Sequence, residues 1–248
     1  ALLQTRKIDA IVVTHLYGRL HAMNRITEIA QAAGASVVED CAQAHGASAR
    51  GTRAGAFGHV GCFSFYPTKN LGALGDGGAI ITDDPDLADR IDRLRQYGWQ
   101  RKYDVRLAGG RNSRLDELQA AVLRRKLPAL DGSNNRRVDI ARKYSAKISN
   151  RHVKCPHVAD QEYVAHLYVI RVAEQRDSLM KHLSAQGIGC DIHYPIPDHL
   201  QAVNLGRAQG ELPVTEDLAE RVLTLPCFPE LTEAEVQSVI DAVNSWVP

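Results

Sequence analysis

The sequence has no long apolar run, little net charge and few cysteines. Its apolar stretches, such as residues 10–14 and 77–81, are far shorter than the roughly 20 residues that cross a membrane. The net charge of +1 gives no sign of a nucleic acid as partner. Five cysteines form an odd set without a Cys-x-x-Cys pair, which argues against a disulfide framework or a zinc site. We therefore expect a cytoplasmic protein with reduced thiols, no bound metal and no membrane contact.

Two nucleotide-binding fingerprints are also absent. The glycine-rich stretch GALGDGG, residues 72–78, matches neither the dinucleotide motif G-x-G-x-x-G nor the phosphate loop G-x-x-x-x-G-K-[ST]. A kinase or dehydrogenase is therefore disfavoured. The 248 residues, 44% of them apolar and 24% charged, are typical of a globular protein with one large domain or two moderate ones.

The first half of the chain alternates strand and helix patterns. Apolar runs predict strands at residues 9–13, 35–40, 61–66 and 77–82. Helical spacing of the apolar residues, with Asp84 and Pro85 opening the second helix, predicts helices at residues 23–34 and 84–98. Because the strand runs are unbroken, we expect strands covered on both faces. The pattern predicts an α/β fold, a mostly parallel sheet with flanking helices.

From residue 113 the pattern predicts a smaller α/β unit. Ser113 and Asp116 form a capping signature for the next helix, and Pro128 predicts a kink or restart. The final helix should be capped by Thr232 and Glu235. Between them we expect a strand at residues 166–172, a helix at 176–187 and a strand followed by a turn at 188–197. The boundary between the two units is placed near residue 125.

Polar residues follow two of the predicted strands. Because ligands collect beyond the carboxyl ends of parallel strands, we expect Asp40, Gln43, Ser64 and Lys69 to meet at one edge. A lysine, a carboxylate and a hydroxyl suit pyridoxal phosphate, whose aldehyde the lysine binds as a Schiff base while the carboxylate keeps the pyridine nitrogen protonated. Each residue also has an ordinary explanation, as a solvated turn lysine, a capping aspartate or an outward-facing serine. Spacing alone leaves this chemistry as one option among several.

Three longer motifs narrow these options. The segments VVEDCAQAHGA, GCFSFYPTKNLGALGDGGAI and GRNSRLDELQAAVL resemble the DegT/StrS family of nucleotide-sugar aminotransferases, a branch of the aspartate-aminotransferase fold. The resemblance continues through HLYVIR, IHYPIPDHLQ and LPVTEDLAERVLTLPCFPEL to the closing helix. It implies a type I pyridoxal-phosphate transferase fold, with residues 1–125 as the remainder of the large cofactor-binding domain and residues 126–248 as a small C-terminal domain. Family members have a further N-terminal stretch, so we expect the N-terminal portion to be missing.

The resemblance implies roles for six residues around the cofactor. Lys69 matches the Schiff-base lysine, and Asp40 matches the carboxylate that faces the pyridine nitrogen. Ala42 is expected against the ring and Gln43 near its phenolic oxygen. Ser64 matches a hydroxyl that binds the phosphate.

The sixth residue, Asn112, resembles an asparagine that reaches the phosphate in the neighbouring subunit's site, which implies a homodimer. His193 and Tyr194 lie in a turn that either faces the sugar nucleotide or is only a rigid turn between prolines. His15 and His166 are expected to be structural, because a lone strand histidine is more often hydrogen-bonded packing than a catalyst.

The resemblance implies an aminotransferase that takes an amino group from an amino acid, usually glutamate, and gives it to a nucleotide-linked keto sugar. The motifs are most similar to members that aminate C3 of dTDP-linked 3-keto-6-deoxyhexoses. Related sugar dehydratases carry histidine where this chain has Lys69, so Lys69 favours amino transfer. The alternative is a truncated, non-catalytic relic or binding module of the same fold.

Overall fold

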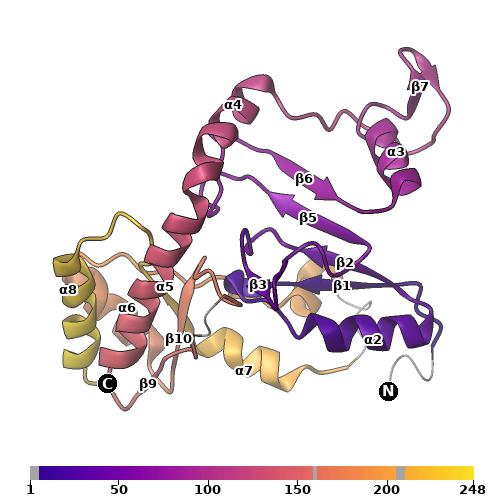
Figure 1. Cartoon of the computed structure of the whole chain (residues 1–248). Coiled ribbons are helices and arrows are strands. Elements are labelled where there is room, and N and C mark those ends of the chain that lie inside the picture. The colour runs from indigo at the N-terminus through magenta and orange to yellow at the C-terminus, as the bar shows by residue number, and fades with distance from the viewer. Residues whose placement is uncertain (1–5, 159–160, 205–209) are drawn as a thin grey trace. The chain divides into compact units, whose positions relative to one another are not determined.

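The computed structural model describes residues 6–158, 161–204 and 210–248 (Figure 1). Its internal contacts divide the chain into two compact units. The first unit comprises Ala1–Asn134 and Asp160–Val164, and the second comprises Asn135–Ala159 and Ala165–Pro248. Within the described ranges no helix has the length and apolar character needed to span a membrane. The assignment of residues 1–125 and 126–248 to a large cofactor-binding domain and a small domain stays a prediction.

A four-stranded sheet in the order β1-β2-β5-β6 forms the centre of the first unit. Its strands are β1 (Ala10–Thr14), β2 (Ser36–Asp40), β5 (Val60–Ser64) and β6 (Gly78–Ile81). The first three run parallel and β6 is antiparallel, which confirms the mostly parallel sheet. The register pairs Thr14 with Asp40 and Asp40 with Cys62, so the carboxyl ends of the parallel strands meet at one edge.

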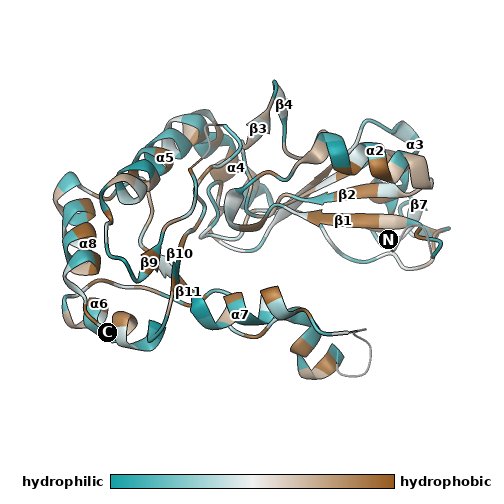
Figure 2. Ribbon diagram, turned by 90° about the horizontal axis from the view of Figure 1, so that it is seen from below, coloured by the Kyte–Doolittle hydropathy of each residue, from teal (hydrophilic) through white to brown (hydrophobic). Residues whose placement is uncertain are grey.

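Helix α2 (Met23–Ala33) covers one face of this sheet (Figure 1). It ends at Gly34, whose φ of 65° is the left-handed conformation that closes many helices. Met23 and Ala30 pack into a buried core with Val13 and Val37. Figure 2 shows the apolar residues along β1 and β2 that supply this core.

One face of β1 and both faces of β6 stay open in the part of the chain that the structure describes. The side chain of Val12 is 67% exposed, and Ile80 and Ile81 are also exposed. The prediction that the strands are covered on both faces is therefore wrong for these two. An unbroken apolar run shows that both faces of a strand are apolar, but it does not show which segment covers each face.

Helix α3 (Pro85–Leu94) begins as predicted, because Asp84 Oδ1 accepts hydrogen bonds from the amides of Asp86 and Leu87. It ends at Leu94 rather than near Gly98, since Tyr97 and Gly98 adopt positive φ values of 61° and 75°. The chain then forms a hairpin of β7 (Trp99–Arg101) and β8 (Asp104–Val105).

The predicted capping role of Ser113 is wrong. Helix α4 (Glu117–Lys126) has Asp116 at its N-cap, without a side-chain capping bond. Ser113 lies before the helix, where its amide donates to the carbonyl of Arg95 and keeps this segment extended. Pro128 lies in the 3-10 helix η2 (Leu127–Ala129), after which α5 (Leu130–Lys147) begins, so the predicted restart is confirmed.

The second unit contains an antiparallel sheet in the order β11-β10-β9. Its strands are β9 (Val153–Lys154), β10 (Tyr168–Val172) and β11 (Val222–Leu225), and its helices are α6 (Arg176–Ala185), α7 (Pro213–Arg221) and α8 (Glu233–Ser245). The tyrosines Tyr144 and Tyr168 are fully buried in its core, with ring centroids 5.1 Å apart. The strand predicted within residues 188–197 is wrong, because among these residues only Asp191 forms a bridge, with Thr224.

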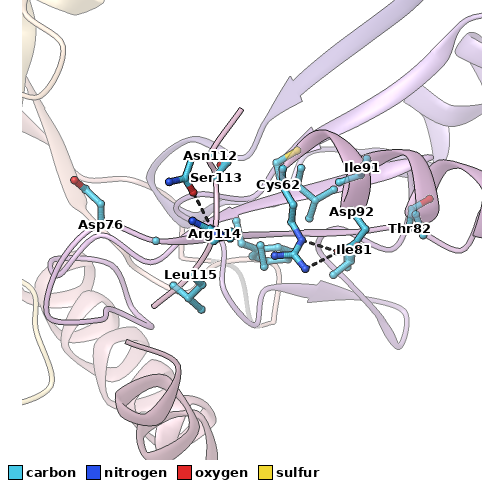
Figure 3. A pocket seen from close by; sticks show the side chains of 17 residues that line it. Cys62, Asp76, Ile81, Thr82, Ile91, Asp92, Asn112, Ser113, Arg114 and Leu115 are labelled. Atoms are coloured by element: carbon cyan, nitrogen blue, oxygen red, sulfur yellow. Dashed lines mark hydrogen bonds and ion pairs between the residues drawn. The ribbon is translucent and has the colours of Figure 1, made fainter. Parts of the chain in front are cut away.

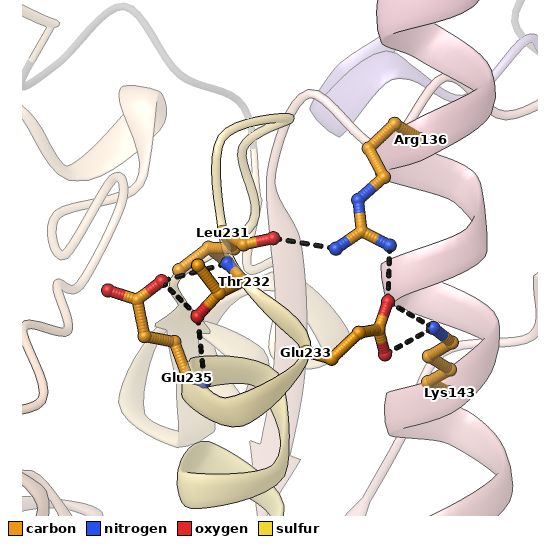
Figure 4. A network of polar contacts seen from close by, with 6 residues as sticks. All are labelled: Arg136, Lys143, Leu231, Thr232, Glu233 and Glu235. Atoms are coloured by element: carbon orange, nitrogen blue, oxygen red, sulfur yellow. Dashed lines mark hydrogen bonds and ion pairs between the residues drawn. The ribbon is translucent and has the colours of Figure 1, made fainter.

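The predicted cap of α8 is confirmed (Figure 4). Thr232 Oγ1 accepts from the Glu235 amide, and Glu235 Oε2 accepts from the Thr232 amide at 2.8 Å. Beside this cap, Glu233 accepts hydrogen bonds from Arg136 and Lys143 of α5. The shorter elements are η1 (Leu16–Gly18), β3 (Ser48–Ala49), β4 (Thr52–Arg53), η3 (Asp198–Leu200) and η4 (Ala202–Asn204).

Candidate functional site

Asp40 is the last residue of β2 and lies at the carboxyl edge of the sheet. Side chains alternate along a strand, so Glu39 points into the core and Asp40 points to the other face. The amide of Ala42 donates to Asp40 Oδ1 at 3.0 Å, and Thr14 Oγ1 donates to Oδ2 at 3.4 Å. Thr14 was not singled out from the sequence, although it ends the neighbouring parallel strand. These two contacts fix the carboxylate in one orientation.

Lys69 lies in a turn that follows β5. Its amide donates to the carbonyl of Tyr66 at 2.9 Å, and the amide of Tyr66 donates to Ser64 Oγ at 3.3 Å. The side chain is half-buried, and burial lowers the pKa of Lys69 below its ordinary value, while the charge of Asp40 partly offsets this effect. Lys69 and Asp40 therefore lie close enough for their charges to interact, and a larger share of the amine is neutral than in an exposed lysine.

His45 is a buried residue near this turn that the sequence reasoning did not select. Its ring centroid lies 5.5 Å from that of Phe63 and 6.0 Å from that of Phe65. Burial lowers the pKa of His45 to about 4, the backbone of Ser64 opposes this effect, and the charge of Lys69 adds to it. The imidazole is therefore neutral at neutral pH. The only signal for it was its place in the motif CAQAHGA.

Gln43 is buried, and its Oε1 accepts a hydrogen bond from the amide of Tyr17. Tyr17 has a φ of 61°, a left-handed conformation that is uncommon for a tyrosine and often occurs near functional sites. Ala42, the residue before Gln43, is half-buried and is bound through its amide to Asp40. The segment after β2 is thus fixed by two hydrogen bonds, one from Ala42 to Asp40 and one from Tyr17 to Gln43.

A second acid, Glu39, is fully buried beneath this edge. It accepts hydrogen bonds from His15 Nε2 at 2.9 Å and from the amides of Gly55, Phe57 and Gly58. Together with His15 and Cys41 it forms a group whose spacing would suit a metal ion. However, its oxygens are already used by these four donors, and burial together with the nearby carboxylates raises the pKa of the Cys41 thiol. The arrangement is that of a buried structural hydrogen bond between His15 and Glu39, as expected for His15.

The glycines after Lys69 serve the packing of their own loop. A Cβ atom on Gly72 would lie 2.3 Å from the carbonyl oxygen of Pro67, and one on Gly78 would lie 2.7 Å from that of Phe63. The loop is also fastened to α4, because Lys126 Nζ donates to the Gly72 carbonyl at 2.8 Å. The close backbone approach that glycine allows is therefore needed here for the fold itself.

Asn112 lies elsewhere in the first unit, on a cavity of about 1080 Å³ beside β6 and α3 (Figure 3). Its side chain is exposed and its Oδ1 accepts from Arg114 Nε at 3.0 Å. None of the contacts found for Asn112 within the described ranges reaches Lys69, Asp40 or Ser64. Its role in a neighbouring subunit stays a prediction.

His193 and Tyr194 belong to the second unit. The ring nitrogen Nδ1 of His193 shares a hydrogen bond of 2.8 Å with Thr224 Oγ1. Tyr194 has a φ of 62° and a side chain that is 54% exposed. The turn is rigid at His193 and open at Tyr194, and contact with a substrate stays a prediction for both.

Comparison with known proteins gives one consistent family. The model of the DegT/DnrJ/EryC1/StrS aminotransferase family matches residues 3–244. A dTDP-3-amino-3,4,6-trideoxy-alpha-D-glucose transaminase of Streptomyces venezuelae is 46% identical over 98% of this chain and 64% of its own length. A dTDP-3-amino-3,6-dideoxy-alpha-D-galactopyranose transaminase of Aneurinibacillus thermoaerophilus is 47% identical over 98% of this chain and 66% of its own length.

A solved structure is also similar over nearly the whole chain. The crystal structure of S. venezuelae DesV in complex with a ketimine intermediate matches with a TM-score of 0.91 and 46% identity. The match covers 96% of this chain and 65% of the DesV chain. The chain thus spans about two thirds or slightly less of the length of these relatives.

Proposed function

Because the chain belongs to the DegT/DnrJ/EryC1/StrS aminotransferase family, we propose that it works as a pyridoxal-phosphate-dependent aminotransferase on a nucleotide-linked keto sugar. Pyridoxal phosphate is the cofactor of this family, and the structural match confirms the predicted type I transferase fold. One observation carries the proposal for this chain. The half-buried amine of Lys69, whose pKa is lowered by burial, lies within electrostatic reach of the Asp40 carboxylate.

The donor set at this edge of the sheet fits the cofactor. Lys69 Nζ has no hydrogen bond or ion pair to the residues that the structure describes, so the amine is available to an aldehyde. The Asp40 carboxylate is oriented by Ala42 and Thr14 and can pair with a protonated ring nitrogen. A hydroxyl for a phosphate group is present in Ser64, the last residue of β5, five residues before Lys69.

Each residue then has a defined task. When bound, pyridoxal phosphate supplies an aldehyde that condenses with amines and a ring that accepts electrons. The Asp40 carboxylate would pair with the protonated ring nitrogen, and the Ser64 hydroxyl would donate to the phosphate. Lys69 Nζ would hold the aldehyde group of the cofactor and, as a free neutral amine, would accept a proton as general base and give it up as general acid. A lowered pKa suits this role, because the amine must be neutral before it can accept a proton.

Other residues complete the proposed site. Ala42 would lie against the ring, Gln43 would stand near its phenolic oxygen, and Asn112 would reach the phosphate in the neighbouring subunit of a homodimer. The amino donor is glutamate and the acceptor is a dTDP-3-keto-6-deoxyhexose, which His193 and Tyr194 contact. The names of the two transaminases above support a dTDP-linked 3-keto sugar. We place the reaction in the cytoplasm.

The alternative hypothesis is that the chain is a non-catalytic relic or binding module of the same fold. It is disfavoured because Lys69, Asp40 and Ser64 are all retained and because Lys69 keeps a lowered pKa. A chain that had lost its chemistry would have no reason to keep this combination.

Absorption spectroscopy tests the proposal. Mixing the purified chain with pyridoxal phosphate should give a yellow complex that bleaches on addition of glutamate with release of 2-oxoglutarate. Lys69→Ala should abolish both signals, whereas Lys181→Ala, which changes an exposed lysine of α6, should retain them. Absence of a yellow complex in the unmodified chain, or an unchanged complex in Lys69→Ala, would refute the proposed function.

A further inference from the structure

The residue after Lys69 fastens its turn to other parts of the first unit. Asn70 Nδ2 donates to Asn134 Oδ1 at 2.8 Å and to the carbonyl of Val164 at 3.0 Å. Asn70 is only half-buried, but both of its partners are buried. Since Lys69 and Asn70 are neighbours in the chain, a fixed Asn70 side chain also fixes the backbone from which the Lys69 side chain extends.

Asn134 carries this connection onward to the segment that follows Asp40. Its Oδ1 accepts from Asn70, and its Nδ2 donates to the carbonyl of His45 at 2.7 Å. Asn134 is 5% exposed, so its bond to His45 is shielded from water, and its bond to the half-buried Asn70 is shielded in part. The amide of Asn134 therefore connects the turn of Lys69 to the stretch that begins at Asp40.

The surroundings leave this amide little freedom. Gly46 has a φ of 88°, and a Cβ atom there would lie 2.8 Å from Asn134 Nδ2, so the amide rests directly against the main chain. Near it, Arg53 donates two hydrogen bonds of 3.1 Å to the carboxylate of Asp131. The first turn of α5 is thus held to residues 45–53 at two points.

We propose that Asn70 and Asn134 are positioning residues for the proposed reaction: together they set where the Lys69 amine stands relative to the Asp40 carboxylate. The inference rests on the proposed function, in which these two groups act on one cofactor. Neither asparagine needs to touch the cofactor. Their contribution is to keep the amine at the half-buried place that favours its neutral form.

The consequence for Lys69 has a definite direction. Two causes act on the pKa of Lys69: its burial, which lowers the pKa, and the charge of Asp40, which raises it. If the turn is released, the amine gains water and the desolvation that lowers its pKa is reduced. The pKa of Lys69 should then rise toward that of an ordinary lysine, so a smaller fraction of the amine should be neutral at any pH below this pKa.

Competitive acetylation measures this without cofactor. The full chain is treated with acetic anhydride at a series of pH values, and mass spectrometry follows the peptides that contain Lys69 and, as internal reference, the exposed Lys181. Asn70→Ala breaks one end of the connection. Asn134→Asp keeps an acceptor for Asn70 and loses the donor to His45. Both should slow acetylation of Lys69 relative to Lys181 by about fivefold near pH 8, as expected when the neutral fraction falls with a rising pKa.

Asn150→Ala is the matched control, because Asn150 Nδ2 also donates to two carbonyls, those of Val243 and Trp246, each at 2.8 Å. It should leave the Lys69 profile unchanged. Circular dichroism shows which variants are folded. If Asn134→Asp does not fold, the test is decided by Asn70→Ala, because Asn70 is only half-buried. A wild-type Lys69 profile in folded Asn70→Ala, or an equal change in Asn150→Ala, would overturn the inference.

Failure of this inference is distinguishable from failure of the proposed function. The acetylation profile is measured on Lys69 alone, whereas the function is tested by the yellow complex and its reaction with glutamate. If the Lys69 profile shifts in the asparagine variants but the unmodified chain binds no cofactor, the positioning of Lys69 is supported and the proposed function is refuted. If the profile does not shift in these variants but the unmodified chain transaminates, the proposed function is supported and the positioning role is refuted.

Discussion

Replacing Glu39 with glutamine perturbs the most deeply buried anion near the candidate site. The carboxylate accepts four hydrogen bonds, two on each oxygen, from His15 Nε2, Gly55, Phe57 and Gly58. Glutamine offers one oxygen and one NH₂ group. If its oxygen keeps the amides of Phe57 and Gly58, its NH₂ group faces the other two donors.

The histidine cannot adapt to this change without a further loss. It could accept from the new NH₂ group only by moving its proton to Nδ1, but Nδ1 accepts from the amide of His21 at 3.4 Å. Two buried donors therefore lose their acceptor, and each costs about 1–3 kcal/mol. We expect Glu39→Gln to lower the free energy of unfolding by about 4 kcal/mol, the middle of the range for two donors.

Urea unfolding followed by circular dichroism measures this loss. With a slope of about 2 kcal/mol per molar urea, the midpoint should fall by about 2 M. Glu220→Gln, at an exposed position of α7, is the control and should leave the midpoint unchanged. If Glu39→Gln unfolds at the same urea concentration as the unmodified chain, the stabilising role of the four contacts is refuted.

The effect should also depend on pH in a fixed direction. Burial acts to raise the pKa of Glu39, but the bonds from His15 and the three amides outweigh it and hold the pKa below its ordinary value of about 4.3. The carboxylate therefore contributes stability above that value, and this contribution is lost as the pH falls through the lowered pKa. The difference between the two chains should be full at pH 7 and shrink below about pH 4. A difference that stays constant down to pH 2 would contradict this reasoning.

Three further substitutions test local geometry. Thr232→Ala should destabilise the second unit by about 1 kcal/mol in the same urea assay, because α8 loses its capping box. Thr215→Ala is the control, because Thr215 lies in α7 and does not cap that helix. Gly72→Ala should markedly lower stability and Lys69 reactivity, because its Cβ would lie 2.3 Å from the Pro67 carbonyl oxygen. Gly132→Ala, in α5 with open space around it, should instead raise stability by about 0.5–1 kcal/mol. Equal effects of the two glycine substitutions would refute the packing argument.

The sequence predicted the elements whose signals are local. Helix α8 begins at its capping box, and α3 begins at Asp84, because in each case side chain and backbone partner lie two or three residues apart. Ser113 carried the same signal and gave a wrong helix start. Its backbone pairs with Arg95, 18 positions earlier in the chain, and no pattern within one segment reports such a contact.

The candidate site shows the same division. The meeting of Asp40 and Lys69 at one sheet edge could be expected, because β2 ends at Asp40, its parallel neighbour β5 ends at the same edge, and Lys69 lies in the turn that follows β5. The two asparagines could not, since Asn70 and Asn134 lie 64 residues apart and the bond between them depends on how α5 packs. The neutral state of His45 likewise depends on burial among aromatic rings from another strand.

The adjacent acids Glu39 and Asp40 make the numbering of this strand unusually strict. They resemble each other chemically, yet Glu39 is sealed inside the protein and Asp40 lies at the carboxyl edge of the sheet, in the candidate site. A shift by one position would still place an acid opposite an acid, but it would exchange the buried Glu39 for Asp40, whose side chain points to the other face of the sheet. Distant relatives should therefore be compared through the histidine that contacts the first acid and the threonine that contacts the second, because those partners reveal which acid is which.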